Sequence, residues 1–381
     1  MIDRYLRLGL RLGKHVDGFV DSYYGPGEHK QEVDAEAPGD PRALAGEAAA
    51  LLDEAREIEG PRGAWLRAQL VGLETVSRRL AGEEIGWVEE VQLCHGITPT
   101  LTPESEFAET HALLDETFGD AEGQLRWRAS QTVPPETLVE AARILTEDAR
   151  ERTRELFDLP EGEETTIDVV ENEPWSAYNY YLGGLRSRVV ICSDLPTPSF
   201  FLAELGPHEL YAVHHTEHAW KEHLLVGGQG IVEESLLLTG TPQSTISEGI
   251  AMVAPLILYG DELHERAAEL LAPLGVPYDV EGANAMERAE PALRRVTDNM
   301  AWFLNVENRP HEEVVEYGMR WRRQSRDHVE KTISFVTDST WRAYSATYSG
   351  GRDLVERWVG GEPARFRRLL TEQLTPADLA T

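Results

Sequence analysis

The amino-acid sequence predicts a mainly α-helical fold with one small β-hairpin or sheet. Apolar residues recur every three or four positions along most of the chain, which is typical of helices that pack against a core. One region, residues 164–193, is instead rich in β-branched and aromatic residues. The 381 residues, 41% of them hydrophobic, are enough to bury a substantial core in one large domain or in two.

The N-terminal part, residues 1–158, is expected to be helical. Apolar spacing and turn residues predict helices at 2–21, 41–58, 62–82 and 134–157. Another helix is expected to begin with Thr102 as its N-cap and Pro103 as its first residue, because these residue types suit those positions.

The second part, residues 159–381, begins after a break that contains proline and glycine. Two β-prone runs on either side of Gly183-Gly184 predict a hairpin within residues 164–193. Beyond Pro198 the pattern is helical again almost to the end. The two parts form either two domains or one continuous domain.

Charge and cysteine content exclude several classes of function. The chain has 67 acidic and 36 basic residues, a formal net charge of −31, so binding to nucleic acid or to anionic membranes is not expected. No stretch of about 18 apolar residues is present, and the N-terminus lacks a signal-peptide pattern. The two cysteines favour a reducing cytoplasm. The sequence gives no indication of an oligomeric state.

A dense group of histidines is the main candidate for chemistry. Five of the chain's 12 histidines fall within one short segment: His208, His214, His215, His218 and His223. Imidazoles and carboxylates are the ligands of catalytic zinc, which uses three protein ligands and keeps one position open. The segment therefore predicts a Zn²⁺ site.

Helix geometry limits which of these residues can share one ion. His214 and His218 lie one turn apart on one face, and Glu217 beside them completes an H-x-x-E-H pattern. His208 and His215 share a face but are about 10 Å apart along a straight helix, too far for one zinc. His208 and His214 could converge only through a kink.

A third ligand must come from a separate segment. Glu248 opens an apolar, helix-like run and lies far enough downstream for a turn and an antiparallel helix. Glu233 and Glu234 are closer in the sequence and compete with it.

Several segments together resemble the bacterial domain-of-unknown-function family 885. Residues 208–215 resemble its H-E-A-Y-P-G-H-H stretch, and Ser247-Glu248-Gly249 resembles its S/V-E-G element. Further similar segments follow one another at 21–26, 175–181, 186–188, 194–196 and 346–351.

This resemblance implies a large helical fold similar to thermostable-type zinc metallocarboxypeptidases. His208, His214 and Glu248 would then be the metal ligands and Glu209 the general base. Tyr348 would donate a hydrogen bond to the oxyanion of the reaction. The expected substrate is a small peptide or amide, and the hairpin at 178–188 would bind it along its edge.

One departure from the family leaves two ligand sets open. Ala212-Val213 stand where the family has the proline and glycine that would supply a kink. A regular helix would instead favour His214, His218 and Glu248, with His215 and His218 as alternative ligands and Glu217 as alternative base. The same departure motivates a second hypothesis, a binding or scaffold protein without catalysis. A third alternative is a metal-dependent hydrolase of a non-peptide bond.

Overall fold

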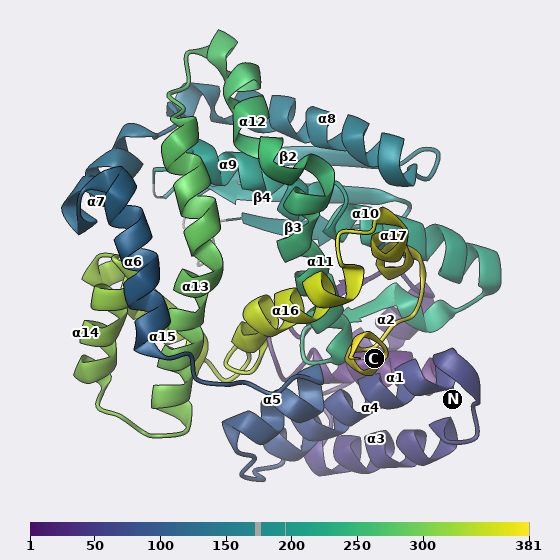
Figure 1. Cartoon of the computed structure of the whole chain (residues 1–381). Coiled ribbons are helices and arrows are strands. Elements are labelled where there is room, and N and C mark those ends of the chain that lie inside the picture. Colours follow the sequence, from purple (N-terminus) through teal and green to yellow (C-terminus); the bar gives the residue numbers. More distant parts are fainter. Residues whose placement is uncertain (172–176, 195, 381) are drawn as a thin grey trace.

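The protein is described here by a computed structural model that covers residues 1–171, 177–194 and 196–380. Within these residues it is mainly α-helical, with one two-stranded and one three-stranded sheet (Figure 1). The predicted mainly α class is confirmed. The expectation of a single sheet was incomplete, because a second sheet joins two segments far apart in the chain. No helix in the described ranges is long and apolar enough to cross a membrane.

The bounds of the elements are as follows. The helices before the three-stranded sheet are α1 (Ile2–Leu12), α2 (Gly27–Ala35), α3 (Pro41–Ala55), α4 (Gly60–Leu80), α5 (Trp87–His95), α6 (Glu104–Phe118), α7 (Ala121–Ser130) and α8 (Leu138–Phe157). The helices after it are α9 (Ser199–Leu205), α10 (His214–Lys221), α11 (Pro242–Tyr259), α12 (Leu263–Leu271), α13 (Val280–Asn305), α14 (His311–Arg322), α15 (Arg326–Thr337), α16 (Thr347–Val359), α17 (Pro363–Thr371) and α18 (Pro376–Leu379). The strands are β1 (Val20–Tyr23), β2 (Glu164–Val170), β3 (Ala177–Tyr181), β4 (Arg186–Cys192) and β5 (Leu236–Leu238).

The first helix is shorter than the sequence pattern predicts. It was expected to continue to Asp21, but α1 ends at Leu12, and Gly18 at φ 73° helps the chain turn. The chain then forms β1, which pairs antiparallel with β5. Local periodicity could not reveal this strand, because its partner lies more than 200 residues away.

The helices expected at 41–58, 62–82 and 134–157 lie close to those ranges as α3, α4 and α8, whereas α2, α5 and α7 were not predicted. The cap of α6 also differs from the prediction. Pro103, rather than Thr102, is the N-cap of α6. The backbone N–H of Thr102 instead donates to the side-chain oxygen of Asn299 at 2.9 Å. This tertiary contact fixes Thr102 outside the helix.

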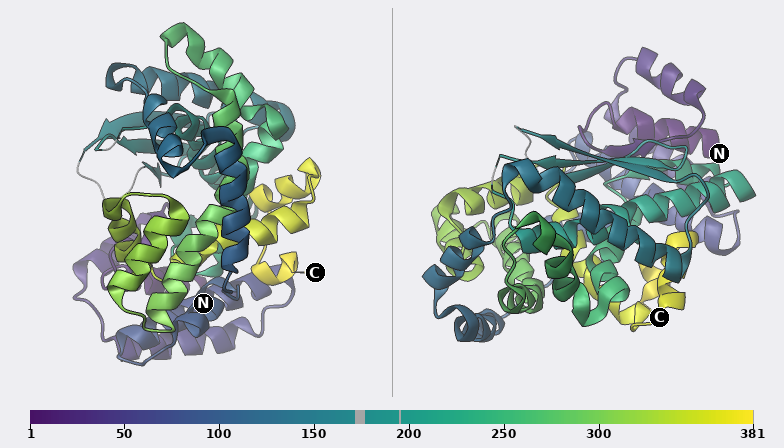
Figure 2. Two further views of the ribbon diagram at one scale, coloured as in Figure 1. Left: turned by 60° about the vertical axis from the view of Figure 1, so that its left-hand side comes forward. Right: turned by 90° about the horizontal axis from the view of Figure 1, so that it is seen from above.

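The β-prone region forms the three-stranded sheet in the order β2-β4-β3. β3 and β4 form the predicted antiparallel hairpin, and both Gly183 and Gly184 adopt positive φ in its turn. β2 pairs parallel with β4. α8 packs against the sheet, as the view from above in Figure 2 shows.

The centre of the molecule is the crossing of α11 and α16, which pack closely together (Figure 1). A Cβ added to Gly249 would lie 2.5 Å from the carbonyl oxygen of Gly351, so the two backbones can meet only because both residues are glycine. This crossing sets Glu248 beside the first turn of α16. One buried core unites Phe157 of α8 with residues of α11, α16 and α17. The division of the chain near residue 158 stays a prediction.

Candidate metal centre

His208 and His214 lie on two helical segments separated by a break. α9 continues into a π-helical turn, Gly206–Leu210, and α10 begins at His214. Between them Ala212 adopts the left-handed region, with φ 68°. The expectation that Ala212-Val213 permit a regular helix is therefore wrong. Alanine disfavours this conformation, but the break is held by tertiary contacts and by a hydrogen bond of 3.0 Å from the Ala212 N–H to the Thr216 hydroxyl.

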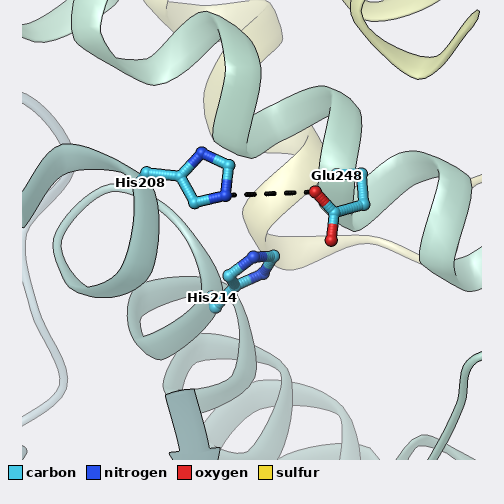
Figure 3. Close-up of side chains that lie close together, drawn as sticks. All are labelled: His208, His214 and Glu248. Carbon is cyan, nitrogen blue, oxygen red and sulfur yellow. Dashed lines mark ion pairs between the residues drawn. The ribbon is translucent and has the colours of Figure 1, made fainter. Parts of the chain in front are cut away.

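The break brings His208 and His214 together with Glu248 of α11 (Figure 3). One possible ligand atom from each of the three lies within 4.8 Å of the others. Within the described ranges, no other set of three histidine, cysteine or acidic side chains meets that distance. The two imidazole centroids are 5.6 Å apart, and Nε2 of His208 is 4.0 Å from Oε2 of Glu248.

The donor atoms of this group suit a zinc ion. Oε1 of Glu248 accepts a hydrogen bond from the Tyr344 hydroxyl, whereas Oε2 is buried and has no hydrogen-bond partner. A buried carboxylate oxygen without a partner is costly, and a cation would satisfy it. Ligand atoms around tetrahedral zinc are about 3.4 Å apart, so the side chains need to close by only about 1 Å.

A chain of buried hydrogen bonds sets the orientation of His214. Nδ1 of His214 is 2.9 Å from the hydroxyl of Ser247, which donates to Oε2 of Glu217 at 2.7 Å. Lys221 holds the other oxygen of Glu217 at 2.7 Å. An ionised carboxylate only accepts, so the single proton of Ser247 points to Glu217. Ser247 must then accept from the Nδ1–H of His214, which leaves Nε2 with a free lone pair for a metal.

The alternative ligand set is not brought together. The rings of His214 and His218 stack with centroids 6.2 Å apart, and His218 with Glu248 forms no group of ligand atoms within 4.8 Å. Burial lowers the pKa of His218 to about 3. One oxygen of Glu217 accepts from Ser247 and the other from Lys221. Glu217 therefore orients His214 through Ser247 and is not available as the alternative base.

His215 points away from the candidate site into a separate cluster. Its Nδ1 is 2.9 Å from the Ser187 hydroxyl and its Nε2 is 3.1 Å from Glu163. Both ring nitrogens are engaged, so His215 is no candidate ligand. The competing carboxylate Glu233 is paired with Arg62 at 2.5 Å, and neither it nor Glu234 joins the group of three.

Glu209 lies beside the candidate ligands, as a base would. Its Oε1 is 4.0 Å from Nε2 of His208, and 12% of its side chain is exposed. Burial raises its pKa to about 7, and the carboxylates of Glu248 and Asp21 act in the same direction. The side-chain amide of Asn179 on β3 donates to the Glu209 carbonyl, so the hairpin adjoins the site as expected.

Two tyrosines of the C-terminal part reach the site, one of them unforeseen. Tyr344 donates to Glu248, and its ring meets the ring of Tyr348 at 5.8 Å in a T-shaped contact. Sequence analysis singled out Tyr348 only; the four-residue spacing of the two tyrosines was the available signal. Asp21 was also missed as a site residue, although Tyr178 donates to it and its charge acts on His214.

The candidate site is partly open to solvent. His208 keeps 25% of its side chain exposed, yet burial is the main cause that lowers its pKa to about 3. Water therefore reaches the imidazole of His208, while the surrounding protein disfavours its charged form. For His214 burial acts in the same direction, but the surrounding carboxylates, Glu248 first, outweigh it and raise the pKa.

Comparisons with known proteins show the fold alone. No family model and no curated protein matches the sequence. Among solved structures, a crystal structure from Colwellia psychrerythraea, named as "the putative lipoprotein", is similar with a TM-score of 0.54 and 13% sequence identity. The similarity covers 93% of this chain and 68% of the other. Of the segments that carry the family resemblance, Trp175, Ser176 and Leu195 lie outside the described residues.

Proposed function

We propose that the protein is a zinc-dependent, peptidase-like hydrolase that acts on small peptides or amides. One observation carries the proposal: His208, His214 and Glu248 converge within 4.8 Å, and a buried oxygen of Glu248 has no partner. Two imidazoles and one carboxylate are a known ligand set of catalytic zinc. Zinc in such a site acts as a Lewis acid and generates a nucleophile from water near neutral pH.

The protein's own residues supply the proton transfer and the positioning. Glu209, whose carboxylate is 4.0 Å from His208, would accept a proton from the attacking water and pass it to the leaving nitrogen. Tyr348 would donate a hydrogen bond to the oxyanion that develops on the carbonyl. Tyr344 and Ser247 would hold Glu248 and His214 in orientation through the contacts described above.

The hairpin offers a place for an extended substrate. β3 is an edge strand of its sheet, and Asn179 ties it to Glu209. A peptide aligned along such an edge would bring its carbonyl groups past the base. The chain has two cysteines, Cys94 and Cys192, both of them buried, and this low cysteine content supports a reducing cytoplasm as the place of action.

Metal analysis of the purified, dialysed protein tests the proposal. We expect about one zinc per chain in the wild type, because zinc in such sites binds tightly. Glu248→Ala and His214→Ala should each lower the content below about 0.2 and abolish peptide hydrolysis. His223→Ala is the matched control, since His223 is exposed in the same histidine-rich segment.

Three outcomes separate the hypotheses. Zinc below about 0.2 per chain in the wild type, unchanged by either substitution, contradicts the metal site. Full zinc content without hydrolysis of a broad peptide library favours a binding or scaffold protein. Full zinc content with activity only on ester or lactam bonds favours a hydrolase of a non-peptide bond.

A further inference from the structure

Four buried side chains with unpartnered oxygen atoms lie between the N-terminal helices and α11. They are Tyr5 of α1, Gln69 of α4, Glu234 of the 3-10 turn Val232–Ser235, and Gln243 of α11. None of the four residues is more than 4% exposed. We call these four residues the oxygen cluster.

Glu234 and Gln243 are in direct contact within the cluster. The side-chain amide of Gln243 donates to Oε2 of Glu234 at 3.4 Å, which leaves the amide oxygen of Gln243 and Oε1 of Glu234 without partners. The Tyr24 hydroxyl donates to the backbone carbonyl of Glu234 at 2.9 Å and so holds the turn in place. Two unpartnered oxygens therefore lie on neighbouring side chains.

One face of α4 places Gln69 against the segment that carries Glu234. Arg62, at the start of this face, pairs with Glu233 at 2.5 Å. A Cβ added to Gly72 would lie 2.6 Å from the backbone carbonyl oxygen two residues before α11. Gln69 lies two turns after Arg62 and one turn before Gly72, close to the same face. Its amide, whose oxygen and nitrogen are both buried without partners, thus faces the segment between these two contacts.

α1 places Tyr5 beside the same segment. A Cβ added to Gly9 would lie 2.6 Å from the side chain of Leu236, which directly follows the turn. Tyr5 lies one turn before Gly9 on the same face of α1, and its ring meets the ring of Trp65 at 6.4 Å where α1 packs against α4 (Figure 1). Burial raises the pKa of Tyr5, and the charge of Glu234 acts next in the same direction.

Glu234 is a buried carboxylate without a nearby positive partner. Glu233 beside it is paired with Arg62, and the buried Glu217 is paired with Lys221 at 2.7 Å. Among the described residues, no cationic side chain lies within ion-pair distance of Glu234. Burial raises its pKa, and Lys221 opposes that shift only from a greater distance. Buried charges in proteins are normally paired or bound to a metal ion, so the charge of Glu234 requires a partner.

The chemistry of the cluster suits a cation that prefers oxygen. It offers one carboxylate oxygen, two amide oxygens and one phenolic oxygen. Carboxylate and carbonyl oxygens are the ligands of hard cations, and carbonyl oxygens can replace the hydration shell of potassium. A single carboxylate balances an ion of single charge, whereas a divalent ion would leave a buried positive charge. A water molecule could fill the hydrogen bonds, but it would leave the charge of Glu234 uncompensated.

We propose that the oxygen cluster binds one monovalent cation, sodium or potassium, with ligands from Tyr5, Gln69, Glu234 and Gln243. The bound ion would connect α1 and α4 to α11. This site shares no residue with the candidate metal centre, and the inference does not depend on the proposed hydrolase function. It implies that the stability of the fold responds to the identity of the cation in solution.

Thermal unfolding of the full-length protein in three salts tests the site. Sodium, potassium and choline chloride are compared at one ionic strength, because choline is too large to occupy a buried site. We expect about 100 mM sodium or potassium to raise Tm by at least about 2 °C over choline, with saturation, since an ion that binds only the folded state stabilises it. The ion with the larger effect is the preferred occupant.

Substitutions assign the salt effect to the cluster. Glu234→Gln removes the charge and should abolish the difference between the salts. Gln69→Met keeps the length of the side chain and removes one oxygen, so the cation concentration at half-effect should rise about tenfold. Its stability in choline chloride should be unchanged or higher, because an unpaired buried amide is lost. Glu57→Gln, at an exposed position after α3, should behave as the wild type.

Two outcomes overturn the site. Equal melting temperatures of the wild type in the three salts would show that no monovalent cation binds and that the cluster holds water only. A salt effect that survives unchanged in Gln69→Met and Glu234→Gln would show that the cation binds elsewhere. Circular dichroism of each variant checks the fold, and Gln69→Met decides the question if Glu234→Gln fails to fold. Zinc content is measured separately, so neither outcome bears on the candidate metal centre.

Discussion

His214 and His215 are neighbours in the chain, yet they belong to two clusters with opposite character. His214 faces His208 and Glu248, and one oxygen of Glu248 is buried without a partner. His215 faces Glu163, whose two oxygens accept from Arg150, Tyr211 and His215 itself. In the first cluster a potential ligand atom has no hydrogen-bond partner, whereas in the second both carboxylate oxygens of Glu163 accept hydrogen bonds.

This difference separates the proposed binding site from a structural support. Buried polar groups in a support are fully hydrogen-bonded, because an unpaired group costs free energy. A site that awaits a ligand keeps unpaired atoms, and the rest of the fold must offset their cost. The Glu163 cluster supplies part of this stabilisation, because its hydrogen bonds hold Tyr211 and His215 on either side of the strained Ala212.

The largest expected effect is on stability. Glu163→Gln should lower the free energy of unfolding by about 3 kcal/mol, because it breaks a buried ion pair with Arg150. Glu248→Gln should leave stability unchanged or raise it when zinc is absent, since it removes a charge from a costly position. Urea unfolding in the presence of a chelator measures both. Equal losses in the two variants would erase the distinction between the clusters.

The next effect concerns zinc affinity. Ser247→Ala should weaken zinc binding about 10- to 100-fold, because His214 loses the hydrogen bond that fixes its tautomer. Ser247→Thr retains the hydroxyl and serves as the control. Competition with a chromophoric chelator gives the affinities. An unchanged affinity in Ser247→Ala would show that the chain from His214 to Glu217 does not support the metal.

A third effect is the pH dependence of stability. Burial opposes the charge of Glu163, but hydrogen bonds from His215 and Arg150 outweigh it and lower the pKa below the ordinary value of 4.5. The folded state therefore holds its proton less tightly than the unfolded state, so this contribution is present above about pH 4.5 and is lost as pH falls.

Glu163→Gln should reduce the loss of folding stability on acidification. The change in slope is at most about 1.4 kcal/mol per pH unit, the value for one proton. Unfolding at several pH values between about 6 and about 3.5 measures the slope. Glu161→Gln, at an exposed position nearby, is the control. A slope that is the same in Glu163→Gln and the wild type would contradict the assigned role of the carboxylate.

The smallest effect is expected at the break itself. Ala212→Gly relieves the left-handed strain of about 1 kcal/mol but adds chain entropy and removes a buried methyl group. Stability should therefore change by less than about 1 kcal/mol, with zinc content unaffected. Ala212→Val should be clearly destabilising, because a β-branched residue resists positive φ. If valine were tolerated as well as glycine, the left-handed conformation would not be needed.

Local patterns were sufficient for the fold class and for several elements. Apolar spacing predicted α3, α4 and α8 nearly at their observed bounds, and Gly183-Gly184 predicted the hairpin. The strand β1 and the cap at Pro103 could not be predicted in this way. Both depend on partners distant in the sequence, Leu236–Leu238 for the strand and Asn299 for the residue before the cap.

The sequence by itself determined which chemistry is available. The histidines, Glu209 and Glu248 are ligand and base types at spacings that permit a zinc site. It left open whether His208 or His218 accompanies His214. Only the tertiary structure decided this, because Ala212 takes a conformation that its own preferences disfavour and that distant contacts through Glu163 enforce. Local propensity is worth about 1 kcal/mol at such a position, and a buried network of hydrogen bonds and ion pairs outweighs it.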